Sequence, residues 1–375
     1  MSITLSHSSA LTVLRMLRAN GVNVRDMEPM AIAQPSTWVN RRWTKREFEP
    51  PQWVWPQPTR DKHLHVLVPK GARYIRMSNV ETHTLWTGDP SKSALWVDTH
   101  ASIVCPELLF LQMAEVYPLP SLVMLGYELC GNFSRDATSP IDGEATIEIP
   151  TATSVKQLME FLAAYDGTRG VAKARMALSY VCDFALSPME ALLATMYALP
   201  PKEAGYGMGP ITLNDRVRVG SSDDSSAQRS RYPDLSFSFA PVGLNYDGEY
   251  HLDLVGLVRE ARKAATAKGD EQIAAEAALW AKMEAVRAQV VDDNMRNRQL
   301  AASGRVVFPV TKEDVYGWGN MDELTRQILQ CAQSVFGVNV DHFIQTLEDT
   351  DRKRDRYALL TAFLPSGAPR RTILI

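Results

Sequence analysis

Residues 233–251, PDLSFSFAPVGLNYDGEYH, decide the fold that we expect for this chain. Residues 232–239 and 242–251 each have the composition of a short strand, and the Ala240-Pro241 pair between them is typical of a turn. The stretch therefore predicts two neighbouring strands that form a hairpin.

Side chains that can bind a cation lie on one face of this predicted hairpin. Asp234 opens the first strand, and Asn245 and Asp247 share one face of the second because they are two residues apart. Oxygen ligands on two adjacent strands can hold a divalent cation against a phosphate. His251 follows on the same strand as a candidate general base. Glu190, on a helix predicted upstream, is a candidate further carboxylate ligand.

The segments around the hairpin predict a mixed pattern of helices and strands. Ser187 and Glu190 have the spacing of a capping box, and Pro188 stands at the first helical position, so a helix is expected to begin there. The elements then follow the order α-β-β-β-(αα)-α-β-α. The other predicted elements are a strand at 211–219, a helical insert at 252–291, a helix at 292–304 closed by Gly304, a strand at 305–310 and a helix at 321–337.

The first part of the chain predicts a separate α+β domain. Leu11, Leu14 and Leu17 at helical spacing predict a helix that ends before Gly21. Short β patterns within 63–98 and apolar helical patterns at 105–117 and 120–131 follow. We therefore expect an α+β protein with an N-terminal α+β domain at 1–135, a helical linker at 136–185, a mixed-sheet domain flanked by helices at 186–336 and a C-terminal tail at 337–375.

The C-terminal pattern resembles the PD-(D/E)xK nucleases of the restriction-endonuclease-like superfamily. It looks like the branch of domains of unknown function that is related to very-short-patch mismatch repair endonucleases, and the likeness covers 187–318. The residues that match this branch are Glu190 on the early helix, Asp234, Asp247, Gly248 and His251 in the core, and Asp293, Arg296, Leu300 and Gly304 on the later helix.

This resemblance implies a restriction-endonuclease-like sheet and a phosphodiester hydrolase that acts on DNA with Mg²⁺ or Mn²⁺. The site residues that it implies are Asp234, Asp247 and Glu190 as metal ligands, His251 and Asn245 as further catalytic residues, and Arg296 and Arg298 as substrate-binding residues.

The chain departs from the family pattern in two places. Asn245 stands where the family has a glutamate, so a Mg²⁺ site would have one anionic ligand fewer. The helical insert 252–291 replaces a short connection. Its apolar stripe is typical of a packed helical hairpin or of an oligomer surface, and consists of Ile273, Ala277, Trp280, Met283 and Val290.

Other functions stay open beside the nuclease. The N-terminal part, with VLVP at 66–69 and VCPELLFLQMA at 104–114, resembles the antitoxin domain of AbiE-type (type IV) toxin–antitoxin systems. That likeness implies a non-catalytic transcriptional regulator of a bacterial toxin–antitoxin or phage-defence system. A third alternative is an interaction scaffold that binds a protein partner, or a second copy of the chain, through the inserted helices.

The charge balance excludes binding to nucleic acid through bulk positive charge. Lysine and arginine number 40 against 43 acidic residues, for a net charge of −3. Any contact with DNA must therefore come from a local patch. Arg169, Lys173 and Arg175 could form one that faces a phosphate, or could lie on a solvated helix end.

The composition of the chain also indicates its cellular compartment and whether it has a zinc site. The 4 cysteines lie among apolar residues without a CxxC pair, which is typical of reduced thiols in a cytoplasmic protein. No apolar run is long enough to span a membrane. His63 and His65 have no cysteine nearby, so the sequence predicts no zinc site there.

The tryptophan-rich segment 38–55 is either a surface loop or a surface that stacks on bases.

Overall fold

The computed structural model describes residues 3–32, 58–68, 78–84, 93–99, 101–215, 217–219, 229–231, 233–247 and 254–365. At 217–219, 229–231, 247, 254 and 255 it describes the backbone alone. The tryptophan-rich segment 38–55 and His251 lie outside the described residues.

The chain forms two compact units. Unit 1 comprises the chain up to Gly207 and residues 362–365, and unit 2 comprises Met208–Thr361. Each unit combines helices with a sheet of its own, so the expected α+β class is confirmed. The boundaries expected at 135 and 185 both fall inside unit 1.

Unit 1 is built on a six-stranded sheet with the order β2-β5-β6-β1-β3-β4. The strands are β1 (Ile3–Leu5), β2 (Pro29–Met30), β3 (Leu64–Val68), β4 (Val80–Thr84), β5 (Ala94–Trp96) and β6 (Ala101–Val104). β3 and β4 are parallel, and their register sets His65 opposite Glu81 and Leu67 opposite His83. One face of these two strands therefore carries two histidines and a carboxylate.

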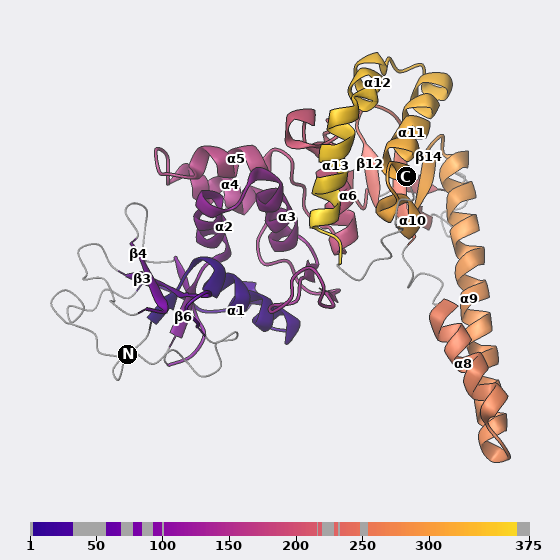
Figure 1. The fold of residues 1–375 in the computed structure, drawn as a ribbon, viewed down its shortest axis with the longest axis horizontal. Coiled ribbons are helices and arrows are strands. Elements are labelled where there is room, and N and C mark those ends of the chain that lie inside the picture. Colours follow the sequence, from indigo (N-terminus) through magenta and orange to yellow (C-terminus); the bar gives the residue numbers. More distant parts are fainter. Residues whose placement is uncertain are drawn as a thin grey trace. The chain divides into compact units, whose positions relative to one another are not determined.

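The helices of unit 1 supply most of its apolar core. They are α1 (His7–Ala19), α2 (Pro106–Val116), α3 (Leu119–Cys130), α4 (Val155–Ala163), α5 (Val171–Leu178) and α6 (Pro188–Ala198), with the 3₁₀ turns η1 (Val24–Asp26) and η3 (Pro201–Glu203) and the short hairpin β7 (Phe133–Ser134) and β8 (Thr146–Ile147). α2 and α3 lie side by side and contribute buried side chains such as Phe110 and Tyr127 (Figure 1). Both helices were predicted from their apolar patterns.

A buried ion pair joins α1 to α3. Arg15 donates two hydrogen bonds of 2.8 and 2.7 Å to the carboxylate of Glu128. Arg18 donates to the backbone oxygens of Glu128 and Gly131, which closes the end of α3. These bonds fix the position of α1, and hence of His7 at its first turn.

Unit 2 contains a four-stranded mixed sheet with the order β14-β13-β12-β9. Its strands are β9 (Ile211–Leu213), β12 (Leu235–Phe237), β13 (Val242–Asp247) and β14 (Val306–Thr311). β12 pairs antiparallel with both β9 and β13, which confirms the predicted hairpin, and β14 is parallel to β13. The strand predicted at 211–219 is instead split between β9 and β10 (Val217–Val219), and β10 pairs with β11 (Arg229–Arg231) in a separate sheet.

Two of the predicted helical segments differ from the structure. The helices of unit 2 are α8 (Leu254–Thr266), α9 (Asp270–Ala302), α10 (Lys312–Tyr316), α11 (Asn320–Phe336), α12 (Asp341–Glu348) and α13 (Thr350–Ala362). α9 is one continuous helix of 33 residues where we predicted two, and it lies beside α8 (Figure 1). The segment 337–375, expected to be a tail, contains α12 and α13.

None of the helices that the structure describes has the length and the apolar run needed to cross a membrane.

Candidate functional site

Asp234 and Asn245 meet across the hairpin, as predicted. The backbone N–H of Asp234 donates to Asn245 Oδ1 at 3.1 Å, and the N–H of Tyr246 donates to Asp234 Oδ2 at 2.7 Å. The side chain of Asn245 is buried, with 2% of its surface exposed. Its oxygen therefore holds the backbone of Asp234 in place, which is a positioning role.

The other predicted site residues belong to other elements or lie outside the described side chains. The carboxylate of Glu190 accepts hydrogen bonds from Ser187 Oγ and from the N–H of Leu186, so it stabilises the start of α6 in unit 1. Arg296 forms an ion pair of 3.2 Å with Asp293 on its own helix. Arg298 is exposed on α9, only the backbone of Asp247 is described, and His251 lies outside the described residues. Of the predicted set, the described side chains bring together Asp234 and Asn245.

The three residues of the predicted basic patch, Arg169, Lys173 and Arg175, form ion pairs and a hydrogen bond within unit 1. Arg169 pairs with Glu115 at 3.4 Å, and Arg175 pairs with Asp166. Lys173 Nζ donates to the backbone oxygen of Tyr117 at 3.0 Å. These three cations thus stabilise the surroundings of α5.

Three histidines form a cluster that the sequence alone did not predict. His7 begins α1, His65 lies on β3 and His83 lies on β4. One ring nitrogen of each lies within 4.8 Å of the corresponding nitrogen of the other two. Within the part of the chain that the structure describes, this is the group of three potential ligands that is compact enough to hold a metal ion.

The rings of the cluster contact one another directly. His65 Nδ1 and His83 Nε2 share a hydrogen bond of 2.8 Å. The ring of His7 stacks on that of His83, with centroids 3.7 Å apart. Glu81 approaches both strand histidines, with oxygens 3.8 Å from His65 Nδ1 and 3.9 Å from His83 Nε2. His63 Nδ1 also lies 3.8 Å from Glu81, although His63 does not belong to the cluster.

Backbone contacts hold these histidines in place. The N–H of His7 donates to Gln112 Oε1 on α2 at 3.1 Å, and the N–H of His65 donates to Ser9 Oγ on α1 at 2.9 Å. His7 has a φ of 47°, in the left-handed region that residues other than glycine rarely adopt. Such strain persists where the surrounding structure enforces it, and it is common at functional sites.

The environment keeps the three imidazoles neutral. Burial, together with the nearby His83 and His65, lowers the pKa of His7 to about 3. Burial and His65 lower the pKa of His83 to about 4, against the opposing effect of Glu81. Burial also lowers the pKa of His65. A neutral imidazole has a free lone pair, which is the form that binds a metal ion.

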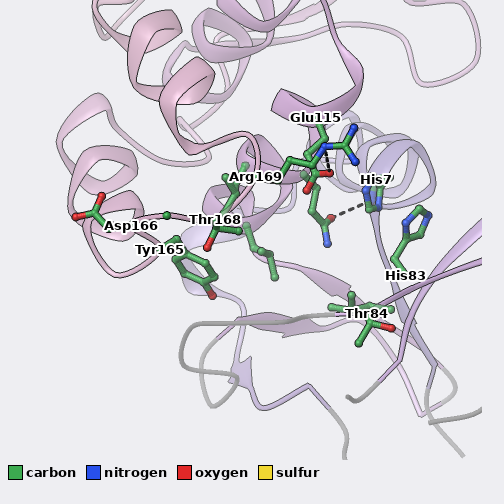
Figure 2. Close-up of a pocket in the computed structure, with 13 residues that line it drawn as sticks. His7, His83, Thr84, Glu115, Tyr165, Asp166, Thr168 and Arg169 are labelled. Carbon is green, nitrogen blue, oxygen red and sulfur yellow. Dashed lines mark hydrogen bonds and ion pairs between the residues drawn. The ribbon is translucent and has the colours of Figure 1, made fainter. Parts of the chain in front are cut away.

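A cavity of about 550 Å³ opens beside the cluster. His7 and His83 lie next to each other on its wall, with Glu115 and Arg169 close to His7 (Figure 2). The loop between α4 and α5 lines the cavity and requires glycine at position 170. Gly170 has a φ of +87°, and a Cβ there would lie 3.2 Å from Glu115 Cγ. Two residues of the cluster, His7 and His83, therefore border a space that can admit water and a small molecule.

No family model, no curated protein and no solved structure matches the chain.

Proposed function

We propose that unit 1 binds one divalent transition-metal ion of the zinc class through His7, His65 and His83 and presents it to the adjoining cavity. The observation that carries the proposal is the convergence of three imidazole nitrogens within 4.8 Å, beside a 550 Å³ cavity whose wall includes His7 and His83. Imidazole ligands suit zinc, copper, iron or nickel, whereas Mg²⁺ prefers oxygen. Three protein ligands leave a fourth position for water or substrate, which is the pattern of catalytic zinc sites.

Metal binding requires a small rearrangement. Zinc–nitrogen bonds of about 2.0–2.1 Å in a tetrahedral site separate the nitrogens by about 3.3 Å. His65 Nδ1 and His83 Nε2, now 2.8 Å apart, must therefore move apart slightly and give up their shared proton. The ring of His7 must turn out of its stack with His83, and the cavity beside it provides the space.

The neighbouring polar groups favour hydrolytic chemistry. A zinc-bound water ionises near pH 7 and can attack a carbonyl or phosphoryl group. The oxygens of Glu81 lie 3.8 and 3.9 Å from His65 Nδ1 and His83 Nε2, so this carboxylate places a negative charge beside the proposed cation. Arg169, on the cavity wall, pairs with Glu115 at 3.4 Å, and an anionic substrate group would have to compete with that carboxylate for its positive charge. We propose hydrolysis or hydration of a small polar substrate as the reaction class.

Metal titration tests this proposal. Isothermal titration of the full chain with Zn²⁺ should give one site, and His83→Gln should weaken binding at least 100-fold. His63→Gln is the matched control, because His63 contacts the same Glu81 from outside the cluster, and it should change the affinity less than about 3-fold. Circular dichroism confirms that each variant is folded. Absence of a stoichiometric site, or equal losses in both variants, contradicts the proposal.

A second candidate function rests on unit 2. We propose that it acts on DNA as a phosphodiester hydrolase with Mg²⁺ or Mn²⁺, in the cytoplasm. The sheet order β9-β12-β13-β14 with a parallel last strand supports this, as does Asp234 held opposite Asn245. The antitoxin-like regulator is the alternative, and it would bind DNA without cutting it.

Plasmid cleavage separates these two alternatives. The hydrolase should nick supercoiled plasmid with Mn²⁺ and lose that activity in Asp234→Ala, but not in Asp355→Ala on the exposed side of α13. Binding to DNA without cleavage supports the regulator, and cleavage retained by Asp234→Ala overturns the site.

A further inference from the structure

Helix α9 exposes an apolar stripe at heptad spacing. Ile273 and Trp280 are 70% and 65% exposed, and Met283 and Val290 are 43% and 40% exposed. Ile273 and Trp280 are seven residues apart, as are Met283 and Val290, and the two pairs are offset in the way of a and d positions of a coiled coil. The described residues of unit 2 leave these large side chains open to solvent.

The neighbouring helix α8 packs on another side of α9. Alongside the stripe, the positions of α9 that are partly covered are Ala275, Leu279, Lys282, Val286 and Gln289. They recur every three or four residues, so they form a line of their own about a quarter of a turn from the stripe. The exposed stripe is therefore not the inner face of the α8–α9 hairpin.

The stripe is complementary to itself in one orientation. In an antiparallel pair centred between residues 281 and 282, Ile273 faces Val290 of the other copy and Trp280 faces Met283. The two charged residues within the stripe, Glu276 and Arg287, then face each other as well. All three pairings obey a single twofold axis, which is the symmetry of most homodimers.

The parallel orientation is disfavoured by charge. In register, it would set Glu276 against Glu276 and Arg287 against Arg287, and like charges at such positions repel. The same two residues that oppose a parallel pair therefore support an antiparallel one.

We propose that two copies of this chain associate through an antiparallel pairing of α9. The paired segment 273–290 spans about 27 Å of helix at 1.5 Å per residue. A helix pair of this length buries less surface area than most specific protein–protein interfaces. We therefore expect a dissociation constant on the order of micromolar. This proposal goes beyond metal binding and does not depend on it.

Charge reversal tests both the association and its orientation. Sedimentation equilibrium of the full chain should fit a monomer–dimer equilibrium, with a monomer mass of 41.8 kDa. Glu276→Arg and Arg287→Glu should each weaken association at least 10-fold, because each places like charges opposite one another. The double variant should restore the affinity to within about 3-fold, because it reverses both members of each antiparallel pair.

Two controls complete the experiment. Trp280→Glu should give a monomer, and Glu271→Arg, on the opposite side of α9, should leave the affinity unchanged. Helix content from circular dichroism should be the same in all variants. A wild-type chain that stays monomeric at 100 µM and above, or a double variant as weak as the single ones, overturns the proposal.

Discussion

Glu128 in unit 1 is a buried carboxylate that neighbouring arginines stabilise. Glu128 is 2% exposed, and it accepts two hydrogen bonds from Arg15 and one from the N–H of Arg135. Burial alone would raise the pKa of Glu128, but Arg15, with Arg135 and Arg18, outweighs burial and lowers it to about 2. The carboxylate is therefore ionised in the folded chain, and its loss would leave Arg15 buried without its partner charge.

Replacing Glu128 by glutamine should destabilise unit 1. Removal of one member of a buried ion pair costs about 3–5 kcal/mol, because the other charge stays buried. Glu160→Gln is the control, because Glu160 pairs with Lys156 on the exposed side of α4 and such pairs contribute less than about 1 kcal/mol. Urea denaturation measures both changes. Similar losses in the two variants would show that Glu128 is not the stabilising group.

The same carboxylate predicts a pH dependence. Its pKa is lower in the folded chain, about 2, than its ordinary value of 4.5. Its stabilising contribution is therefore fully present above about pH 4.5 and is lost as the pH falls towards 2. Unfolding free energies measured across this interval should fall more steeply for the wild-type chain than for Glu128→Gln. Parallel curves would contradict the assignment.

At the scale of elements, the sequence predicted local patterns well. Alternation over 233–247 gave the hairpin of β12 and β13, and Gly304, with a φ of +78°, ends α9 where we expected. The strand expected at 211–219 is interrupted because Asn214 takes a φ of 51°, which turns the chain after β9. The break expected before residue 292 is absent, since no glycine or proline interrupts α9 there.

The histidine cluster could not be predicted because it depends on pairing between distant segments. His65 and His83 are 18 residues apart, and His7 is 58 residues before His65. Only the parallel register of β3 and β4, and the placement of α1 beside them, bring the three rings together. The sequence did offer one signal, because four of its seven histidines lie in the first 83 residues. They are His7, His63, His65 and His83.

A buried ion pair links α13, which follows residue 337, to α11. Arg356 on α13 donates hydrogen bonds of 2.8 and 2.9 Å to the carboxylate of Asp322 on α11, and its side chain is buried. Asp322→Ala should therefore destabilise unit 2 by about 3 kcal/mol. Asp349→Ala, whose carboxylate bonds the half-buried Arg352 at the surface, should cost clearly less. Urea denaturation distinguishes them, and equal costs would mean that α13 is not anchored by this pair.

At the scale of the whole molecule, the two units separate the two candidate activities. The histidine cluster belongs to unit 1, and the pair Asp234–Asn245 belongs to unit 2. A ligand that binds only the folded state stabilises the part to which it binds. The two proposed metals, a zinc-class ion and Mg²⁺, should thus act on different parts of the chain.

Hydrogen exchange should show this separation. Zn²⁺ should slow exchange of backbone amides in α1, β3 and β4, which carry the three ligands, and leave β12, β13 and β14 unchanged. His83→Gln should abolish the effect. Equal protection of both units by Zn²⁺ would place its binding site elsewhere.

The ligands of a bound zinc ion can be identified by spectroscopy. X-ray absorption at the zinc edge of the full chain, loaded with one equivalent of Zn²⁺, should show three imidazole nitrogens at about 2.0–2.1 Å and one oxygen. Coordination by sulfur, or by oxygen atoms without imidazole, would contradict a metal site at His7, His65 and His83.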